Sequence, residues 1–269
     1  MKKQSFFEVL TEAINYFANN GYGSQKALDD WVKKLSESAV GSFKSQLETE
    51  KEIKQALKSA YSRLVTQGGL VKEGVSRYTI EKLKPSLRMQ LQRQILASAN
   101  LIKFNRSEAL STTLRRFQGW ATAQPKGGSR AVNVKKEKES IRKPLARLDF
   151  IERRVAIDQT HKLIANINEI VAVDGGAIAA TWHSKWKQIN YDYREDHKER
   201  DKCIYAIRDS WAMQKGFMKA GNDGYTDEIT QPGEEVYCRC HYGYIYTLKK
   251  LPKAMLTKKG QEALALNNK

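Results

Sequence analysis

The first half of the chain repeats apolar residues at the spacing of amphipathic helices. Ser5 and Glu8 stand at the positions of a capping box, and apolar residues continue from there on one helix face. Residues 70–79 break the pattern and are predicted to be a connector or a short strand. The helices predicted in this half begin after Ser5 and Ser24 and cover residues 47–64 and 83–104.

The second half changes from one long helical pattern to short apolar runs between turn residues. A broad apolar stripe from Ile141 to Val173 predicts one long helix, which the turn Asp174-Gly175-Gly176 ends. Residues 177–182 and 242–248 are predicted to be strands, because turn residues bound these short apolar or aromatic runs.

These elements predict an α+β protein with a helical N-terminal half, a long linking helix and a small mixed α/β C-terminal domain. Turn residues followed by a run of lysines and glutamates predict an exposed, flexible, basic arm. The end of the chain is Lys-rich and weakly helical, and we expect it to fray. The predicted parts are a helical region at 1–117, the arm at 118–140, the α/β domain at 141–248 and a basic tail at 249–269.

The formal net charge of +17 adds a preference for polyanions or acidic partners. Residues 80–150 hold 16 Lys or Arg against 5 Asp or Glu, so most of the excess lies there. This favours sequence-independent, salt-dependent binding to double-stranded DNA. The alternatives are a solvated helix surface with a disordered loop, or acidic protein neighbours. The side chains expected to contact DNA or a partner are Arg115, Arg116, Lys126, Arg130, Lys135, Lys136 and Lys138.

Composition also bears on the compartment. The N-terminus turns polar too early for a signal peptide, and no run of about 18 apolar residues exists, so we expect no membrane partner. Three cysteines cannot close a disulfide framework. We therefore expect a reducing compartment and thiols that are free or metal-bound.

All three cysteines and two of the four histidines lie between residues 194 and 241. Because thiolates and imidazoles are the ligands that zinc prefers, Cys203, Cys238, Cys240 and His197 form a candidate zinc site, with His241 as an alternative imidazole. The C-x-C spacing is tighter than that of common zinc motifs. The alternatives are ordinary buried thiols with histidines that cap turns, or a disulfide from Cys203 to one cysteine of the C-x-C pair.

Catalytic interpretations of the same segment are less specific. His197 with Glu195, Asp196 and Asp201 is a candidate hydrolytic metal site, although a solvated loop has the same composition. A cysteine nucleophile lacks the surrounding motif of a known protease class. The chain has neither G-x-x-x-x-G-K-[ST] nor G-x-G-x-x-G after a strand, so we expect no ATP or dinucleotide cofactor.

Six short motifs follow one another over about residues 150–245. They are Arg154-Val155-Ala156-Ile157-Asp158-Gln159-Thr160, Asp174-Gly175-Gly176, Trp182-His183-Ser184, Arg194-Glu195-Asp196-His197, Pro232-Gly233-Glu234 and Cys238-Arg239-Cys240. In the order and spacing of these motifs, the stretch resembles the phage head-morphogenesis proteins, also called phage Mu F-like minor head proteins. The chain departs from that pattern at residues 198–203, where Lys-Glu-Arg-Asp-Lys-Cys replaces a common Leu-Asp-Gly, and at Tyr237, where many members have Asn.

The resemblance implies a structural and binding component rather than an enzyme. Such a protein would be made in the host bacterial cytoplasm and would lie in the capsid interior of the virion. It would associate there with the portal protein, the major capsid protein and packaged DNA during head assembly or DNA delivery. Arg194 and His197 would then be polar anchors that hydrogen-bond a closing C-R-C strand.

Two alternatives remain open at this point. The first is an ADP-ribosyltransferase-like or nuclease activity in the C-terminal half, for which Glu234 and Glu235 are candidate acidic residues by position. The second is a zinc-pinned nucleic-acid-binding protein.

Overall fold

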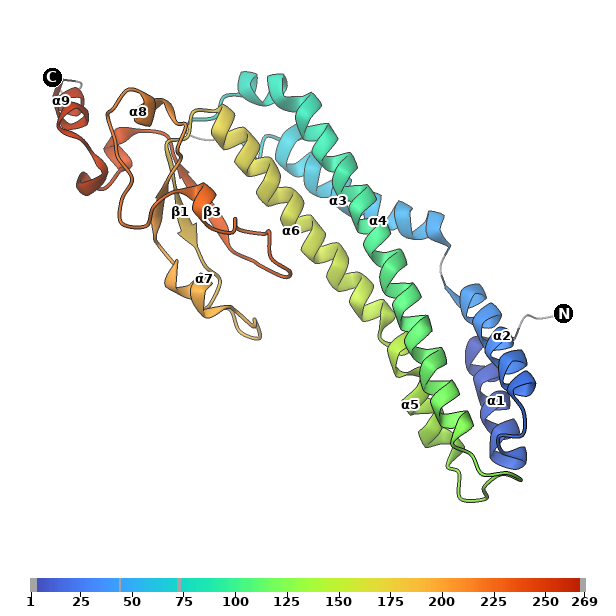
Figure 1. The fold of residues 1–269 in the computed structure, drawn as a ribbon. Helices are drawn as coiled ribbons and strands as arrows, with labels where there is room; N and C mark the ends of the chain where they lie inside the picture. The colour runs from blue at the N-terminus through green and yellow to red at the C-terminus, as the bar shows by residue number, and fades with distance from the viewer. Residues whose placement is uncertain (1–3, 44, 72–73, 267–269) are drawn as a thin grey trace. The chain divides into compact units, whose positions relative to one another are not determined.

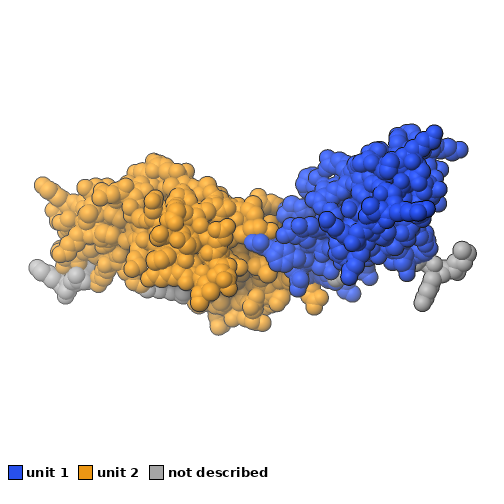
Figure 2. Space-filling model, turned by 90° about the horizontal axis from the view of Figure 1, so that it is seen from below, with its two compact units in different colours: residues 1–53, 97–155 blue, residues 54–96, 156–269 orange. Residues whose placement is uncertain are grey.

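The computed structural model describes residues 4–43, 45–71 and 74–266. The chain divides into two compact units (Figure 2). Unit 1 comprises residues 1–53 and 97–155, and unit 2 comprises residues 54–96 and 156–269. Each unit is therefore made of two separate stretches of sequence, whereas the predicted parts followed one another along the chain.

The secondary structure confirms the predicted α+β class, with a helical N-terminal half and a small sheet in the C-terminal part (Figure 1). In the described ranges, no helix is both long enough and apolar enough to cross a membrane. The helices are α1 (Phe6–Asn20), α2 (Gln25–Ser42), α3 (Gln46–Tyr61), α4 (Arg77–Thr122), α5 (Val134–Ala146), α6 (Leu148–Asp174), α7 (Glu195–Glu199), α8 (Trp211–Gln214) and α9 (Lys258–Leu266). The strands are β1 (Ala179–His183), β2 (Ile204–Ala206) and β3 (His241–Ile245). Shorter turns are the π-helical η1 (Ser62–Thr66) and the 3-10 turns η2 (Thr226–Glu228), η3 (Leu248–Lys250) and η4 (Lys253–Met255).

The core of unit 1 is formed by α1, α2, α5 and the C-terminal part of α4. The predicted capping box begins α1: the Ser5 hydroxyl accepts a hydrogen bond from the Glu8 N–H, and the Glu8 carboxylate accepts one from the Ser5 N–H. Phe17 and Phe117 are fully buried and meet edge to face at 5.8 Å between ring centroids. Phe117 lies far from α1 in sequence, so this contact fixes the C-terminal part of α4 against α1.

Helix α4 is much longer than the predicted helix at 83–104. It begins at Arg77, where the Ser76 hydroxyl accepts a hydrogen bond from the Thr79 N–H, and it ends at Thr122. Pro85 therefore lies inside the helix rather than in its first turn. The prediction missed the start because it relied on Pro85 as a first-turn residue instead of on the Ser76 cap.

The predicted flexible arm at 118–140 is wrong in most of its length. Its first residues complete α4 and its last residues form α5. The connection between these helices is bound to the end of α1 by backbone hydrogen bonds, from Tyr22 to Gln124, from Gly127 to Asn20 and from Ser129 to Ala18. The clusters of Gly, Pro and Lys suggested mobility, but these backbone contacts hold the connection in place.

The predicted single helix from Ile141 to Val173 is two helices, α5 and α6, separated at Arg147. Pro144 lies in the last turn of α5 and cannot donate a hydrogen bond to the Ser140 carbonyl one turn earlier. The Arg116 guanidinium donates to that carbonyl instead, at 3.0 Å. The apolar stripe continues across the break, which is why periodicity alone did not reveal it.

The sheet of unit 2 has the order β2-β1-β3 within the described residues, with both pairings antiparallel. In the register of β1 with β3, Trp182 lies opposite Tyr242 and His183 opposite His241. The two predicted strands are present with shifted ends, and β2 was not predicted because it is only three residues long. Residues 70–71 and 74–79 form no strand, so the described part of that predicted connector contains none.

The predicted frayed tail at 249–269 is wrong for the residues that the structure describes. Leu251, Met255 and Leu256 are buried in the core of unit 2, and Leu256 forms an antiparallel bridge with Met218. Helix α9 follows, and Gly260 packs closely against the Phe217 backbone. The lysines of this segment suggested a tail, but the apolar residues between them belong to the core.

Candidate functional site

The motifs of the C-terminal half meet around one buried indole. Trp182 on β1 is fully buried, and the rings of His197 and Tyr242 meet it edge to face with centroids 5.2 and 5.6 Å away. The Arg200 guanidinium lies over the indole at 5.2 Å from its centroid. Replacing a buried Trp by Ala typically costs about 3–5 kcal/mol. Trp182 therefore determines how α7 sits against the sheet.

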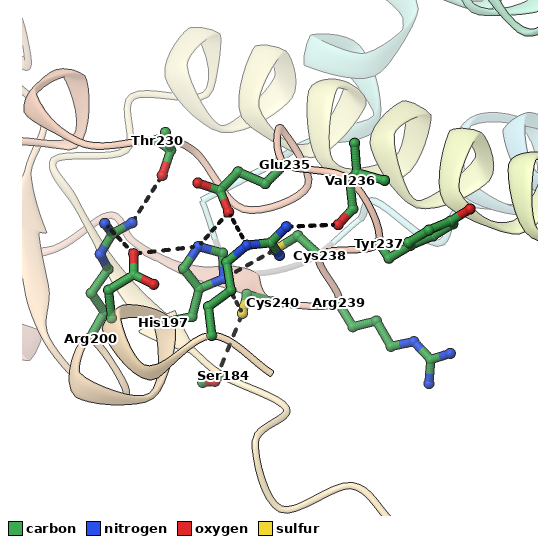
Figure 3. A network of polar contacts seen from close by, with 12 residues as sticks. Ser184, His197, Arg200, Thr230, Glu235, Val236, Tyr237, Cys238, Arg239 and Cys240 are labelled. Atoms are coloured by element: carbon green, nitrogen blue, oxygen red, sulfur yellow. Dashed lines mark hydrogen bonds and ion pairs between the residues drawn. The ribbon is translucent and has the colours of Figure 1, made fainter. Parts of the chain in front are cut away.

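His197 on α7 directs one side of its imidazole toward the C-R-C motif (Figure 3). Its Nδ1 lies 3.7 Å from Cys238 Sγ and 3.6 Å from Cys240 Sγ. One potential ligand atom from each of the three residues lies within 4.8 Å of the others, and all three residues are buried. Three of the four predicted zinc ligands are thus brought together, although His197 is 41 and 43 residues from the cysteines in sequence.

Cys203 is not a member of this cluster, so the predicted set of four ligands is wrong at that position. In the described part of the chain, the group that could hold a metal consists of His197, Cys238 and Cys240. The Cys203 thiol lies 3.7 Å from the Glu199 carbonyl, and burial raises its pKa. All three cysteines are free, so the alternative of a disulfide from Cys203 is not formed either.

Glu235 occupies the other side of the imidazole. Its Oε2 lies 3.4 Å from His197 Nε2 and 2.6 Å from Arg194 Nε. The contact with His197 lacks hydrogen-bond geometry, and both of its atoms are buried. The partner of Glu235 Oε2 is the ion pair with Arg194. Arg194 also donates to the Val236 carbonyl at 3.1 Å, so it binds the segment just before C-R-C as predicted. Sequence reasoning named Glu235 only as a candidate catalytic acid.

The two thiols of the C-R-C motif perturb each other. Their mutual hydrogen bond is the main cause that lowers the pKa of Cys238 and raises that of Cys240, and proximity to His197 lowers the Cys238 value further. The first proton therefore leaves this pair of thiols more easily than the second, and the lowered pKa belongs to Cys238.

The Pro-Gly-Glu turn packs against α6. Pro232 and Gly233 are buried, and Gly233 has a φ of +89°. A Cβ at Gly233 would meet the Ala165 side chain at 3.0 Å, so the turn requires glycine here. The Glu234 carboxylate accepts a hydrogen bond from the Gln231 N–H at 2.7 Å. Glu234, the other predicted catalytic candidate, thus closes the turn.

Tyr237 holds an unusual backbone conformation, with a φ of +62°. Its N–H donates to the Asp158 carboxylate on α6 at 2.6 Å, and its carbonyl accepts from the Tyr191 hydroxyl at 3.3 Å. Asn tolerates left-handed φ values better than Tyr does, which gives a physical reason for the Asn of the resembled family. The predicted C-R-C strand is a loop, because β3 begins only at His241.

Arg239 points away from the thiols on either side of it. Its N–H donates to the Tyr191 hydroxyl at 3.1 Å, and its guanidinium lies over the Tyr191 ring at 5.1 Å. Tyr191 thereby contacts both Tyr237 and Arg239. No motif in the sequence pointed to this tyrosine.

Asp201 anchors the residues that follow β1. Its carboxylate accepts hydrogen bonds from the Ser184 N–H at 2.8 Å and from Trp186 Nε1 at 3.3 Å, and the first of these is the main cause that lowers its pKa. The next residue, Lys202, has a φ of +73°. Lys202 thus has a backbone conformation that suits glycine best.

The predicted hydrolytic metal site is not assembled. Glu195 pairs with Lys198 at 3.1 Å, and Asp201 binds Ser184 and Trp186. Asp196 pairs with Arg200 at 2.8 Å, and its Oδ2 also lies 3.8 Å from His197 Nε2. Glu195 and Asp201 therefore have partners of their own, and only Asp196 of the three contacts the imidazole.

A pocket of about 390 Å³ lies between α6 and the loop that carries C-R-C. Its lining residues include the titratable side chains of His161, Glu169, Lys185 and His241, and it reaches Cys240. Burial raises the pKa of the Glu169 carboxyl, and the Glu234 carboxylate adds to the increase. Sequence reasoning did not identify this pocket, because α6 and β3 are far apart in sequence.

The predicted DNA-contacting residues all lie in unit 1, at the end of α4, in its connection to α5 and on α5. Lys126, Arg130, Lys135 and Lys136 are exposed, and Lys138 is half-buried. Arg115 pairs with Glu108 at 3.2 Å, and Arg116 donates to the Ser140 carbonyl. Arg115 and Arg116 thus already have partners within unit 1.

No protein-family model, curated protein or solved structure matches this chain.

Proposed function

We propose that this protein is a minor structural component of a tailed-bacteriophage head, with unit 2 as a self-closing α+β body and unit 1 as a surface for DNA phosphates. In this role it associates with the portal or the major capsid protein inside the virion and contacts packaged DNA without sequence preference.

The observation that carries this proposal is the convergence of the motifs that resemble the head-morphogenesis proteins. Trp182, Arg194, His197 and the two cysteines of C-R-C are separate in sequence but are joined by contacts. Figure 3 shows the part of this network around His197, Cys238 and Cys240. Each contact joins one element of unit 2 to another: β1 to α7, or α7 to the loop before β3. Motifs whose side chains hold the fold together favour a scaffold role.

The carboxylates of the enzyme alternative are engaged in the same framework. Glu234 caps its own turn, and Glu235 pairs with Arg194 beside His197. Both carboxylates thus make contacts within the fold, although Glu234 is exposed and Glu235 half-buried. We therefore favour the structural role over ADP-ribosyl transfer or nucleic-acid hydrolysis.

Charge supports the DNA-contacting part of the proposal. Residues 97–155 of unit 1 hold 14 Lys or Arg against 5 Asp or Glu. Four exposed cations, Lys126, Arg130, Lys135 and Lys136, lie close together in sequence around the start of α5. Such a surface binds phosphates by releasing counterions, and the affinity then falls steeply as salt rises.

The first test measures binding of the full chain to duplexes of unrelated sequence over a range of salt concentrations. We expect similar affinities for all duplexes. Replacing these four cations by Gln should reduce the slope of log K against log salt by about 0.9 for each phosphate that the variant no longer neutralises. Binding that is indifferent to salt, or a slope unchanged by the four substitutions, would contradict the proposal. The matched control replaces four exposed lysines of α2 and α3 by Gln and should keep the slope: Lys26, Lys33, Lys34 and Lys51.

The second test concerns location. The chain is tagged in the bacterial strain that encodes it, and particles are purified after induction. We expect the tagged chain to co-sediment with DNA-filled particles and to resist added protease until they are opened. A chain found only in particle-free fractions would refute the head assignment, whatever its affinity for DNA.

A further inference from the structure

We propose that His197 Nδ1, Cys238 Sγ and Cys240 Sγ bind one Zn²⁺ ion, with Glu235 orienting the histidine from outside the coordination sphere. This site does not rest on the proposed function, because it is argued from the geometry and burial of its own ligands.

The two nitrogen–sulfur separations fit a tetrahedral centre, and the two sulfur atoms lie within 4.8 Å of each other. Zinc–sulfur bonds of about 2.3 Å and zinc–nitrogen bonds of about 2.0 Å, set at tetrahedral angles, place nitrogen and sulfur about 3.6 Å apart. The observed distances from His197 Nδ1 are 3.7 Å to Cys238 Sγ and 3.6 Å to Cys240 Sγ. An ion can therefore bind with little movement of these side chains.

The chemistry of the donor set selects the metal. Two thiolates and one imidazole favour zinc over the hard cations Mg²⁺ and Ca²⁺, which prefer oxygen ligands. The exposed fractions of His197, Cys238 and Cys240 are 1%, 2% and 7%, so the ligands are shielded from solvent.

Glu235 supplies the outer contact that metal-bound histidines usually have. The ring nitrogen that does not bind a metal commonly donates to a carboxylate, which fixes the tautomer and the ring orientation. His197 Nε2 faces Glu235 Oε2 at 3.4 Å and Asp196 Oδ2 at 3.8 Å, and neither contact is a hydrogen bond. Glu235 Oε2 also pairs with Arg194 Nε at 2.6 Å, which holds the carboxylate beside the ring. Zinc on Nδ1 leaves the proton on Nε2. A small approach of the two side chains then completes that hydrogen bond.

The fourth position is left for a water molecule. Three protein ligands and one water are the arrangement of catalytic zinc sites, whereas structural sites are closed by a fourth protein ligand. The pocket beside α6 reaches Cys240, which gives water a route to this position. The Ser184 hydroxyl lies 3.8 Å from Cys240 Sγ and can hold such a water by a hydrogen bond.

The test measures the metal content of the full chain, purified under reducing conditions from zinc-supplemented cells. We expect about one zinc per chain. Substitution of the reduced, metal-free protein with Co²⁺ should give the thiolate-to-cobalt charge-transfer band and the intense visible bands of a tetrahedral site. Glu235→Gln should weaken zinc binding by about 10- to 100-fold, because it alters only the outer contact.

The matched control is Cys203→Ser, which removes a nearby thiol outside the cluster and should keep both the zinc and the cobalt spectrum. Cys238→Ser and Cys240→Ser should each lose them. If these two variants fail to fold, the wild-type spectrum and the Cys203→Ser comparison still decide. Wild-type protein without zinc that gives no tetrahedral cobalt spectrum would overturn the proposal, and so would loss of metal in Cys203→Ser.

Discussion

The Asp158 carboxylate on α6 accepts a 2.6 Å hydrogen bond from the N–H of Tyr237, 79 residues later in the chain. Asp158 is 5% exposed, and the backbone that it holds is left-handed. The same carboxylate pairs with Lys162 at 3.4 Å and accepts from the Gln159 amide at 3.2 Å. One acidic side chain thus fixes the loop that leads into C-R-C onto α6.

Asp158→Ala should destabilise unit 2, because it leaves the Tyr237 N–H without an acceptor. A buried donor left unsatisfied costs about 1–3 kcal/mol, more where a charged partner is removed. The measurement is thermal unfolding followed by tryptophan fluorescence. Asp158→Asn is the control, since its amide oxygen can still accept from Tyr237, and it should retain more stability. Equal stability of wild type and Asp158→Ala would show that this hydrogen bond is unimportant.

Lys202→Gly should stabilise the protein. Lys202 is exposed and has a φ of +73°, where a non-glycine residue is strained by roughly 1–2 kcal/mol. Part of this gain is offset by the greater freedom of glycine in the unfolded chain. The midpoint of chemical unfolding should therefore rise modestly. Lys215→Gly is the control, because Lys215 has a φ of −81° and gains nothing from glycine. If Lys202→Gly lowered the midpoint of chemical unfolding as much as Lys215→Gly does, the backbone of Lys202 would not be strained.

Glu169→Gln should stabilise the protein at neutral pH and not at acidic pH. Burial, with Glu234 nearby, raises the pKa of Glu169 in the folded state. The folded state thus binds this proton more tightly than the unfolded state does. The resulting stability is present below the unfolded pKa and is lost as pH rises through the folded pKa. Gln carries no charge and escapes this loss.

The check on Glu169 is the unfolding midpoint of both proteins between about pH 4 and 8. The difference between variant and wild type should grow as pH rises. Glu262→Gln removes the same charge from an exposed site on α9 and serves as the control. A constant difference across the range would mean that Glu169 acts through packing rather than through its charge.

The helices could be predicted well where one amphipathic face and a cap determine them. The capping box of Ser5 and Glu8 marked the start of α1, and the apolar stripe marked α6. The predicted helix ends were wrong where a contact with a distant part of the chain determines them. The break before α6 depends on Pro144 and on an arginine of α4 that takes over the freed carbonyl. Such a partner is invisible in the local sequence.

The sequence predicted which residue types form the candidate site, but not which of the cysteines belong to it. His197, Cys238 and Cys240 followed from the concentration of imidazole and thiols in one segment. Cys203 was included because sequence distance says nothing about side-chain direction, and its thiol faces the end of α7. Tyr191 was missed, and Asp158 was named only as part of the motif at 154–160, because their roles depend on backbone groups of the loop before β3.

The backbone hydrogen bonds that tie the connection between α4 and α5 to the end of α1 have a consequence for recognition. Lys126 and Arg130 lie on this connection. A mobile arm would lose conformational freedom on meeting a polyanion, and that loss would weaken the complex. A connection whose backbone is already fixed at Gly127 and Ser129 presents its cations in advance, so a partner would have to order only their side chains.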